Sequence, residues 1–334
     1  MTSIEASAPG KVVISGEYAV LHGGAAIAAA VSRRARVTVT RNGADIVSVT
    51  APGYLPRTIR GQPNDDGRLH WIDSLPAPGA LHLVECVWKR TGGSRHGGLD
   101  ICLDTRDFVD AGTGEKLGLG SSAALAVALA AALMAAGEDG TDVLGRAQGA
   151  HREFQDGRGS GIDVATAFHG GVIAFRRESP VRPCAWVDGL AWRLLWSGRS
   201  ASTAMKLARL DASSRKGVDE LVATADAVTA AWQHRAAGDV LQALSRFSVA
   251  LERYGVDHDL GIFEAGHRSI ADLAGSRRDL LFKPCGAGGG DIGIVLGTSR
   301  KAVDRFAADA AARGFAPLDV ELDPVGLSVR ESPG

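Results

Sequence analysis

A short segment rich in glycine and serine carries the strongest chemical signal in the chain. It reads Gly118-Leu119-Gly120-Ser121-Ser122-Ala123, and Lys116 lies two residues before it. The first turn of a helix leaves backbone N–H groups unpaired and carries about half a positive charge, and glycines let a phosphate approach that backbone closely. The serines add donors and a candidate magnesium ligand, and the lysine adds a mobile positive charge. The segment predicts a phosphate-binding helix N-terminus, with a plain serine N-cap as the simpler alternative.

Two other nucleotide-binding motifs share part of this pattern. The six residues fit G-x-G-x-x-A, the dinucleotide-binding fingerprint, but that fingerprint directly follows a strand. Here residues 110–116 form a polar, glycine-containing stretch that is typical of a loop. No G-K-[ST] sequence closes the segment, which excludes a Walker A loop. A dinucleotide-dependent oxidoreductase is therefore disfavoured.

Two further glycine-containing segments lie near the ends of the chain. Ala8-Pro9-Gly10-Lys11 opens an apolar stretch, where the lysine has a simple alternative role as an exposed charge at a strand edge. Residues 283–291 read Lys-Pro-Cys-Gly-Ala-Gly-Gly-Gly-Asp. Such a loop is either merely flexible or presents consecutive N–H groups to an anion.

Together the three segments resemble the motifs of the GHMP kinases, named for galactokinase, homoserine kinase, mevalonate kinase and phosphomevalonate kinase. They follow the family's order as A-P-G-K-x-x-x-x-G-E-Y, K-x-G-L-G-S-S-A-A and G-A-G-G-G-D, and the resemblance spans residues 8 to 297. It implies a two-domain α+β fold, with an S5-like α/β domain over residues 1–185 and a ferredoxin-like α+β domain over residues 186–334. The active site is expected in the cleft between the domains, where concave sites usually occur.

The resemblance also implies a kinase chemistry with ATP and Mg²⁺ as cofactors. Asp163 would orient or deprotonate the acceptor, and Lys11 would keep Asp163 ionised and stabilise charge on the transferring phosphoryl group. Ser122 is the expected magnesium ligand. From the residues alone, Asp163 has a second interpretation as an N-cap where a Gly-Ser-Gly loop enters a helix. Glu153 lies one place from a glutamate position of mevalonate kinases, and a solvated helix charge is the favoured interpretation for it.

The acceptor is expected to be a small anionic molecule, which needs cationic and hydrogen-bonding partners. Ordinary surface or turn roles are the alternative for each candidate. The candidate acceptor-binding residues are Tyr18, His22, Arg158, Ser160, Gly161, Thr203, Gly286, Ala287, Gly288 and Asp291.

Four details are more similar to the phosphomevalonate kinases than to the mevalonate kinases. They are E-Y-A-V-L at 17–21, Lys116 before the glycine segment, Ala150-His151-x-x-x-Gln155 leading into G-S-G-I-D, and G-G-G-D at 288–291. Residues 21–24 look more like a mevalonate kinase, and Asp156, His169, Cys285 and Ile292 depart from the phosphomevalonate kinase pattern. We expect ATP-dependent phosphorylation of 5-phosphomevalonate, with mevalonate kinase or another GHMP small-molecule kinase as the alternative. A non-catalytic sensor is disfavoured because it would need neither Lys11 nor Asp163.

The elements that must position these residues alternate without a regular βαβ rhythm, which favours α+β layers. A continuous apolar run over 123–136 predicts a buried helix. Further helices are expected over 81–89, 142–155, 263–273 and 300–313, with two more between 216 and 254. Strands are expected over 11–15, 36–40, 99–104, 170–175, 192–198, 291–297 and 327–330. Residues 52–67 are expected to form a loop or an irregular hairpin.

Composition narrows the class of protein further. Of 334 residues, 37 are Lys or Arg and 38 are Asp or Glu, which excludes a strongly basic nucleic-acid-binding protein. The longest apolar run, 14 residues, is shorter than the ~18 that a membrane span needs. No signal peptide and no C-x-x-C pair is visible. We therefore expect a cytoplasmic monomer or homodimer that binds neither nucleic acid nor membranes.

Overall fold

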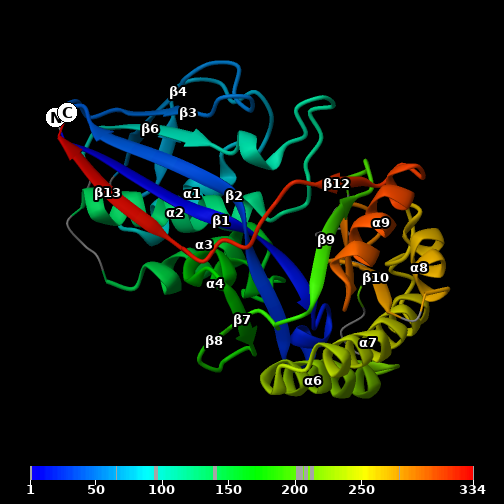
Figure 1. The fold of residues 1–334 in the computed structure, drawn as a ribbon. Coiled ribbons are helices and arrows are strands. Elements are labelled where there is room, and N and C mark those ends of the chain that lie inside the picture. The colour runs from blue at the N-terminus through cyan, green and yellow to red at the C-terminus, as the bar shows by residue number, and fades with distance from the viewer. Residues whose placement is uncertain are drawn as a thin grey trace.

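Two β-sheets form the framework of the chain. The computed structural model describes residues 2–64, 66–93, 97–137, 141–200, 206, 210, 214–277 and 279–333. In these residues one sheet has nine strands and the other has four, and helices cover both (Figure 1).

The nine-stranded sheet is built around two long strands. Its order is β13-β1-β2-β6-β3-β4-β5, and β7 and β8 extend it from β2. Only β3 and β6 pair in parallel among the described strands of this sheet. One stretch of β2 pairs with β7 and a later stretch pairs with β6, so β2 joins both wings. The strands are β1 (Thr2–Ser15), β2 (Ala26–Arg41), β3 (Val47–Thr50), β4 (Ile59–Pro63), β5 (Leu69–Trp71), β6 (Leu99–Asp104), β7 (Val172–Phe175), β8 (Arg182–Cys184) and β13 (Ser328–Pro333).

Four helices cover one face of this sheet. They are α1 (His82–Arg90), α2 (Ser121–Ala136), α3 (Val143–Phe154) and α4 (Ile162–His169). The central helix, α2, packs on β1 and β2 and against the other three helices. Its sequence is apolar on every side, which suits a helix with no solvent-facing stripe. Burial of α2 therefore fixes its N-terminus, and the glycine segment before it, against β1.

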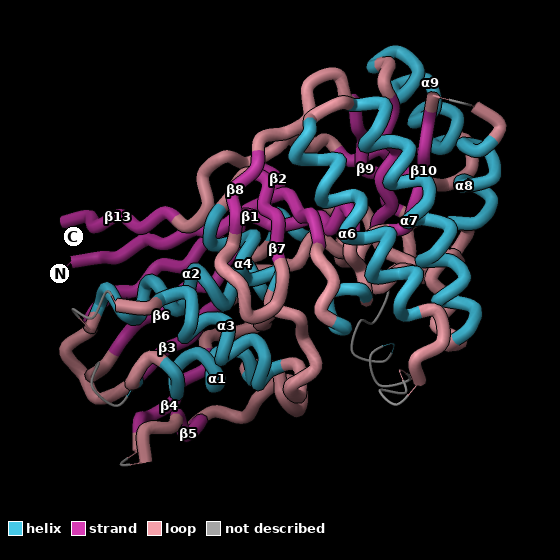
Figure 2. Tube along the Cα trace, turned by 90° about the horizontal axis from the view of Figure 1, so that it is seen from below, coloured by secondary structure: helices cyan, strands magenta, loops and turns pink. Residues whose placement is uncertain are grey.

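The second sheet runs in the order β10-β11-β9-β12 and is antiparallel throughout. Its strands are β9 (Ala191–Trp196), β10 (Leu280–Pro284), β11 (Ile292–Gly297) and β12 (Ala316–Leu318). It packs with α8 (His267–Gly275) and α9 (Arg300–Ala311). The long helices α6 (Val218–His234) and α7 (Ala237–Asp257) lie side by side; α6 reaches β2 and α7 reaches β10 (Figures 1 and 2). No helix of the described residues is long and apolar enough to cross a membrane.

The last strand returns to the first sheet. β13 pairs antiparallel with β1, and this pairing places Thr2 opposite Pro333. Both views show the two chain ends together at this edge (Figures 1 and 2). The proposed division at residue 185 falls between β8 and β9, and β13 lies in the nine-stranded sheet although it comes last in the sequence.

The mixed α+β architecture predicted from the sequence is confirmed. The expected helices correspond to α1, α2, α3, α8 and α9, and the segment 216–254 holds α6 and α7 as expected. Residues 52–67 contain β4, which forms a hairpin with β5. The short strands β3, β5, β8, β10 and β12, which are three to five residues long, were not predicted from the sequence, and the strands predicted over 11–15 and 36–40 are shorter than the observed β1 and β2.

Candidate active site

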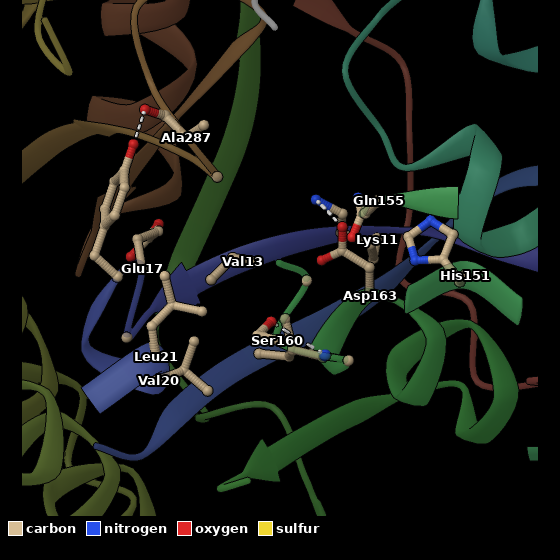
Figure 3. Close-up of a pocket in the computed structure, with 16 residues that line it drawn as sticks. Lys11, Val13, Glu17, Val20, Leu21, His151, Gln155, Ser160, Asp163 and Ala287 are labelled. Carbon is tan, nitrogen blue, oxygen red and sulfur yellow. Dashed lines mark hydrogen bonds and ion pairs between the residues drawn. The ribbon is translucent and has the colours of Figure 1, made fainter. Parts of the chain in front are cut away.

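An ion pair between Lys11 and Asp163 lies at the centre of the site (Figure 3). The Lys11 Nζ and Asp163 Oδ2 atoms are 3.3 Å apart, and the side chains are 10% and 30% exposed. Lys11 comes from β1, and Asp163 from the first turn of α4. Gly161 is the N-cap of α4, with a φ of 88°. Asp163 is therefore the second residue of the helix and does not act as its N-cap.

The glycine segment lies directly against Lys11. The Lys11 backbone N–H donates to the Leu119 carbonyl at 2.8 Å. Gly120 is the N-cap of α2 with a φ of 81°, and a Cβ atom there would lie 2.8 Å from Lys11 Cε. Both the left-handed backbone and the close approach of the lysine require glycine at this position.

The α2 N-terminus can hold an anion. No side chain caps it, so the plain serine N-cap is not what the structure shows, and no acidic residue lies in its first turn. The Ala124 N–H group is the first to donate to a carbonyl within the helix, that of Gly120. The N–H groups of residues 121–123 therefore have no helical carbonyl to donate to. These N–H groups can donate hydrogen bonds to the phosphates of a nucleotide, and Gly118 and Gly120 let the phosphates come close to the backbone.

The third motif contacts the second at Gly118. A Cβ on Gly118 would lie 2.3 Å from Asp291 Cβ, so the G-A-G-G-G-D loop packs on the glycine segment. The Asp291 carbonyl accepts from the Ser197 N–H at 2.8 Å, at the end of β9. All three sequence motifs therefore converge, although two sheets contribute them.

A buried histidine contacts the serine pair. Ser122 Oγ lies 3.0 Å from His151 Nε2, and His151 comes from α3. Burial lowers the pKa of His151 to about 4, with Asp163 opposing that shift and Lys11 adding to it. The ring is therefore neutral at neutral pH. In the sequence, His151 was noted only as part of the Ala150-His151-x-x-x-Gln155 pattern, and no role was predicted for it. Its spacing of one helical turn from Gln155 was the one sign that both side chains face the same side of a helix.

The cavity beside the ion pair lies between elements of both sheets. Tyr18 Oη donates to the Ala287 carbonyl at 2.9 Å, which links the segment after β1 to the loop after β10. The cavity is lined by Lys11, Val13, Gly16, Glu17, Tyr18, Val20, Leu21, His151, Gln155, Gly159, Ser160, Gly161, Ile162, Asp163, Gly286 and Ala287 (Figure 3). Val13, Val20 and Leu21 form an apolar part of its wall, and Lys11, Ser160 and Asp163 form a polar part.

A second ion pair, Glu17–Lys283, is fully buried, and Glu17 lines this cavity. The Lys283 Nζ and Glu17 Oε1 atoms are 2.5 Å apart, and the side chains are 0% and 2% exposed. Glu17 Oε2 has no hydrogen-bond partner in the described structure. Burial raises the pKa of Glu17, and Lys283 opposes the rise. Sequence analysis quoted both residues inside motifs and assigned neither of them a role.

Several residues considered for the site lie away from the cavity. Arg158 and Lys116 are exposed and do not line it, and Glu153 pairs with Lys89 and Arg90 at the surface. His22 Nε2 bonds Tyr254 Oη at 3.0 Å outside the lining. Gly288 packs on Ile262. Thr203 lies outside the described residues.

The described residues contain no group of three or more His, Cys, Asp or Glu side chains that could together hold a metal ion. Ser122 remains the proposed protein ligand for magnesium. A cation there would take its other ligands from the nucleotide phosphates and water, as Mg²⁺ commonly does at kinase sites.

Comparisons with known proteins agree with this geometry. The family model described as "GHMP kinases N terminal domain" matches residues 82–171. A phosphomevalonate kinase from Streptomyces sp. is 32% identical, over 86% of this chain and 88% of the relative. A mevalonate kinase from Archaeoglobus fulgidus is 30% identical, over 87% of this chain and 91% of that relative.

The fold agrees with a solved structure as well. Streptococcus pneumoniae phosphomevalonate kinase, in complex with phosphomevalonate and AMPPNP, has a TM-score of 0.77 at 16% identity and covers 95% of this chain and 99% of its own. The chain therefore belongs to the GHMP kinase family of ATP-dependent small-molecule kinases, and lies among its members of the mevalonate pathway.

Proposed function

We propose that this kinase transfers the γ-phosphoryl group of ATP to the phosphate of 5-phosphomevalonate, giving ADP and 5-diphosphomevalonate. The observation that carries the phosphoryl transfer is the Lys11–Asp163 pair, placed beside the uncapped α2 N-terminus. The choice of acceptor is supported by the phosphomevalonate kinase relative, which matches most of both chains.

Phosphoryl transfer depends mainly on positioning and on neutralising charge. In this proposal the backbone N–H groups at the start of α2 hold the ATP phosphates, and residues 118–123 form that site together with Lys116. Asp163 orients the attacking oxygen of the acceptor. Lys11, whose side chain is mostly buried, lies where it offsets the negative charge that the two substrates bring together.

The acceptor occupies the cavity that Tyr18, Ser160, Gly161, Gly286 and Ala287 help to line. Two phosphate groups at close range repel, so the site needs more positive charge than a mevalonate site. We propose Arg158, two residues before Ser160, for the acceptor phosphate, because a guanidinium binds phosphate through two parallel hydrogen bonds. The exposed side chain has to turn toward the cavity when the acceptor binds.

In the proposed magnesium site, Ser122 Oγ is the protein ligand. The metal ion would neutralise phosphate charge and hold the phosphates in position. His151 Nε2 is placed to accept a hydrogen bond from the Ser122 hydroxyl, which would leave the oxygen lone pairs free to face the metal ion. Ser122→Ala should raise the magnesium concentration needed for half-maximal turnover, and should weaken Mg·ADP binding measured by calorimetry, with little change in thermal stability.

The acceptor is tested by ADP release with mevalonate, 5-phosphomevalonate, homoserine and galactose. We expect the highest kcat/KM with 5-phosphomevalonate. Faster turnover of mevalonate would reject the acceptor assignment and establish the alternative, mevalonate kinase, which the archaeal relative supports. If Ser122→Ala needs no more magnesium than the wild type for half-maximal turnover, the ligand role of Ser122 is rejected, and the acceptor assignment is unaffected.

A further inference from the structure

A second cavity shares a wall with the Lys11–Asp163 cavity. It has a volume of about 490 Å³ and is bounded by α3, α4 and the connection between β7 and β8. The shared wall consists of His151, Gln155, Gly159, Ser160 and Gly161, which line both cavities. A molecule in the second cavity would therefore touch the same loop that borders the proposed acceptor.

The second cavity is rich in arginine. Arg152 reaches it from α3, and Arg176 and Arg177 reach it from the connection after β7. His169 also lines it, and Glu178 is its one acidic residue. We call Arg152, His169, Arg176 and Arg177 the arginine groove.

Two of the three arginines have unused binding capacity. Arg176 pairs with Asp226 of α6 at 2.8 Å and also donates to the Gly23 carbonyl. In the part of the chain that the structure describes, Arg176 has its ion pair with Asp226, whereas Arg152 and Arg177 have none. A guanidinium presents a planar fork of donors that matches phosphate oxygens. A cavity of this size is also typical of small-molecule sites.

We propose that the arginine groove binds the phosphate or diphosphate group of a small molecule, with Arg152 and Arg177 as its main ligands. The site is separate from the α2 N-terminus and does not depend on which acceptor the enzyme uses. The anion belongs to a separate phosphorylated metabolite that acts on the shared wall. The acceptor itself does not supply it, because the one phosphate of 5-phosphomevalonate is the attacking group beside Asp163 and the far end of that molecule is a carboxylate.

Binding is tested with inorganic pyrophosphate as the probe. Isothermal titration is run at fixed free Mg²⁺ and saturating ADP, so that the nucleotide phosphates already occupy their site. We expect wild-type enzyme to bind pyrophosphate and Arg152→Ala/Arg177→Ala to bind it at least tenfold more weakly. The matched control is Arg246→Ala/Arg305→Ala, which removes two exposed arginines from α7 and α9 and should bind as wild type does.

Equal affinity in the groove variant and the control would overturn the proposal, as would the absence of pyrophosphate binding to the ADP-saturated wild type. Unfolding midpoints show whether both double variants are folded. Arg177→Gln alone, which keeps side-chain bulk and removes charge, should weaken binding by a smaller factor. This binding measurement needs no turnover, so failure of the proposed kinase reaction leaves it interpretable.

Initial rates then test whether the groove acts on the neighbouring acceptor site. Pyrophosphate should change the rate without competing with the acceptor, and the groove variant should lose that response. Simple competition with the acceptor, unchanged in the groove variant, would place pyrophosphate in the acceptor site and overturn the proposal. A wild-type rate that stays constant while pyrophosphate saturates the calorimetric site would refute the coupling through the shared wall.

Discussion

The buried Glu17–Lys283 pair joins the end of β1 to β10, and we predict that removing its cation is severely destabilising. In Lys283→Met, an apolar side chain of similar length replaces the ammonium group, beside the Phe247 ring. Glu17 then keeps a carboxylate that is 2% exposed, with neither oxygen paired to a cation. Breaking a buried pair in this way costs about 3–5 kcal/mol. Urea unfolding at pH 7.5, followed by tryptophan fluorescence, measures the loss.

A double-mutant cycle isolates the interaction from the loss of packing. Glu17→Gln leaves a buried cation, whereas Glu17→Gln/Lys283→Met leaves no buried charge. The loss in free energy of unfolding of the double variant should therefore be smaller than the sum of the losses of the two single variants, by about 2 kcal/mol or more. The control is Arg253→Met, which breaks the exposed Arg253–Glu220 pair and should cost at most about 1 kcal/mol.

The loss of folding stability in Lys283→Met should depend on pH. Burial raises the pKa of Glu17, and without Lys283 nothing comparable opposes the rise. An acid with a raised pKa in the folded state contributes stability below its unfolded pKa, and this is lost as the pH rises through the folded pKa. The deficit of the variant should be smaller at pH 5 than at pH 8. A deficit below about 1 kcal/mol that does not change with pH would refute the reasoning.

Three further predictions concern the site itself. Asp163→Asn and Lys11→Met should each lower kcat by roughly 10²- to 10⁴-fold with unchanged unfolding midpoints; near wild-type turnover in both would remove the proposed mechanism. Gly120→Ala should lower kcat because the new methyl group displaces the Lys11 side chain. The control is Gly157→Ala: Gly157 has the same φ of 81° but no atoms close to where a Cβ would lie, so this variant should show the cost of backbone strain alone. Equal losses of kcat in the two variants would contradict this. Because burial lowers the His151 pKa to about 4, His151 contributes stability above pH 6.5 that is lost as the pH falls toward 4. That contribution is roughly 3 kcal/mol; urea unfolding of His151→Gln should show a weaker pH dependence in this range, and an unchanged one would refute it.

The sequence was sufficient wherever local chemistry dictates structure. The apolar run after Gly120 can only be a buried helix, and its glycines and serines specify the N-terminus that approaches Lys11. The α+β architecture and the kinase family followed from motif order. The short strands β3, β5, β8, β10 and β12 were missed because a segment of three to five residues shows no clear hydrophobic period, and because its formation depends on neighbouring strands.

Side-chain partners between distant segments were the harder part. Glu17 and Lys283 are 266 positions apart, and nothing in either local sequence says that they meet. The contact of Ser122 with His151 depends on how α2 and α3 pack. Arg158 stands beside a motif in sequence, yet its side chain lies in solvent, because sequence neighbours in a loop need not share a direction. Its role toward the acceptor phosphate stays a prediction.

The pairing of β13 with β1 has a consequence for synthesis of the chain. A ribosome makes β1 first and its outer partner more than 300 residues later. Until then the outer edge of β1 offers unpaired N–H and C=O groups, which is the condition for association with another chain. A nascent chain stalled before residue 328 should therefore be held in solution by a chaperone that binds extended segments, and should be released only once the closing strand has left the tunnel.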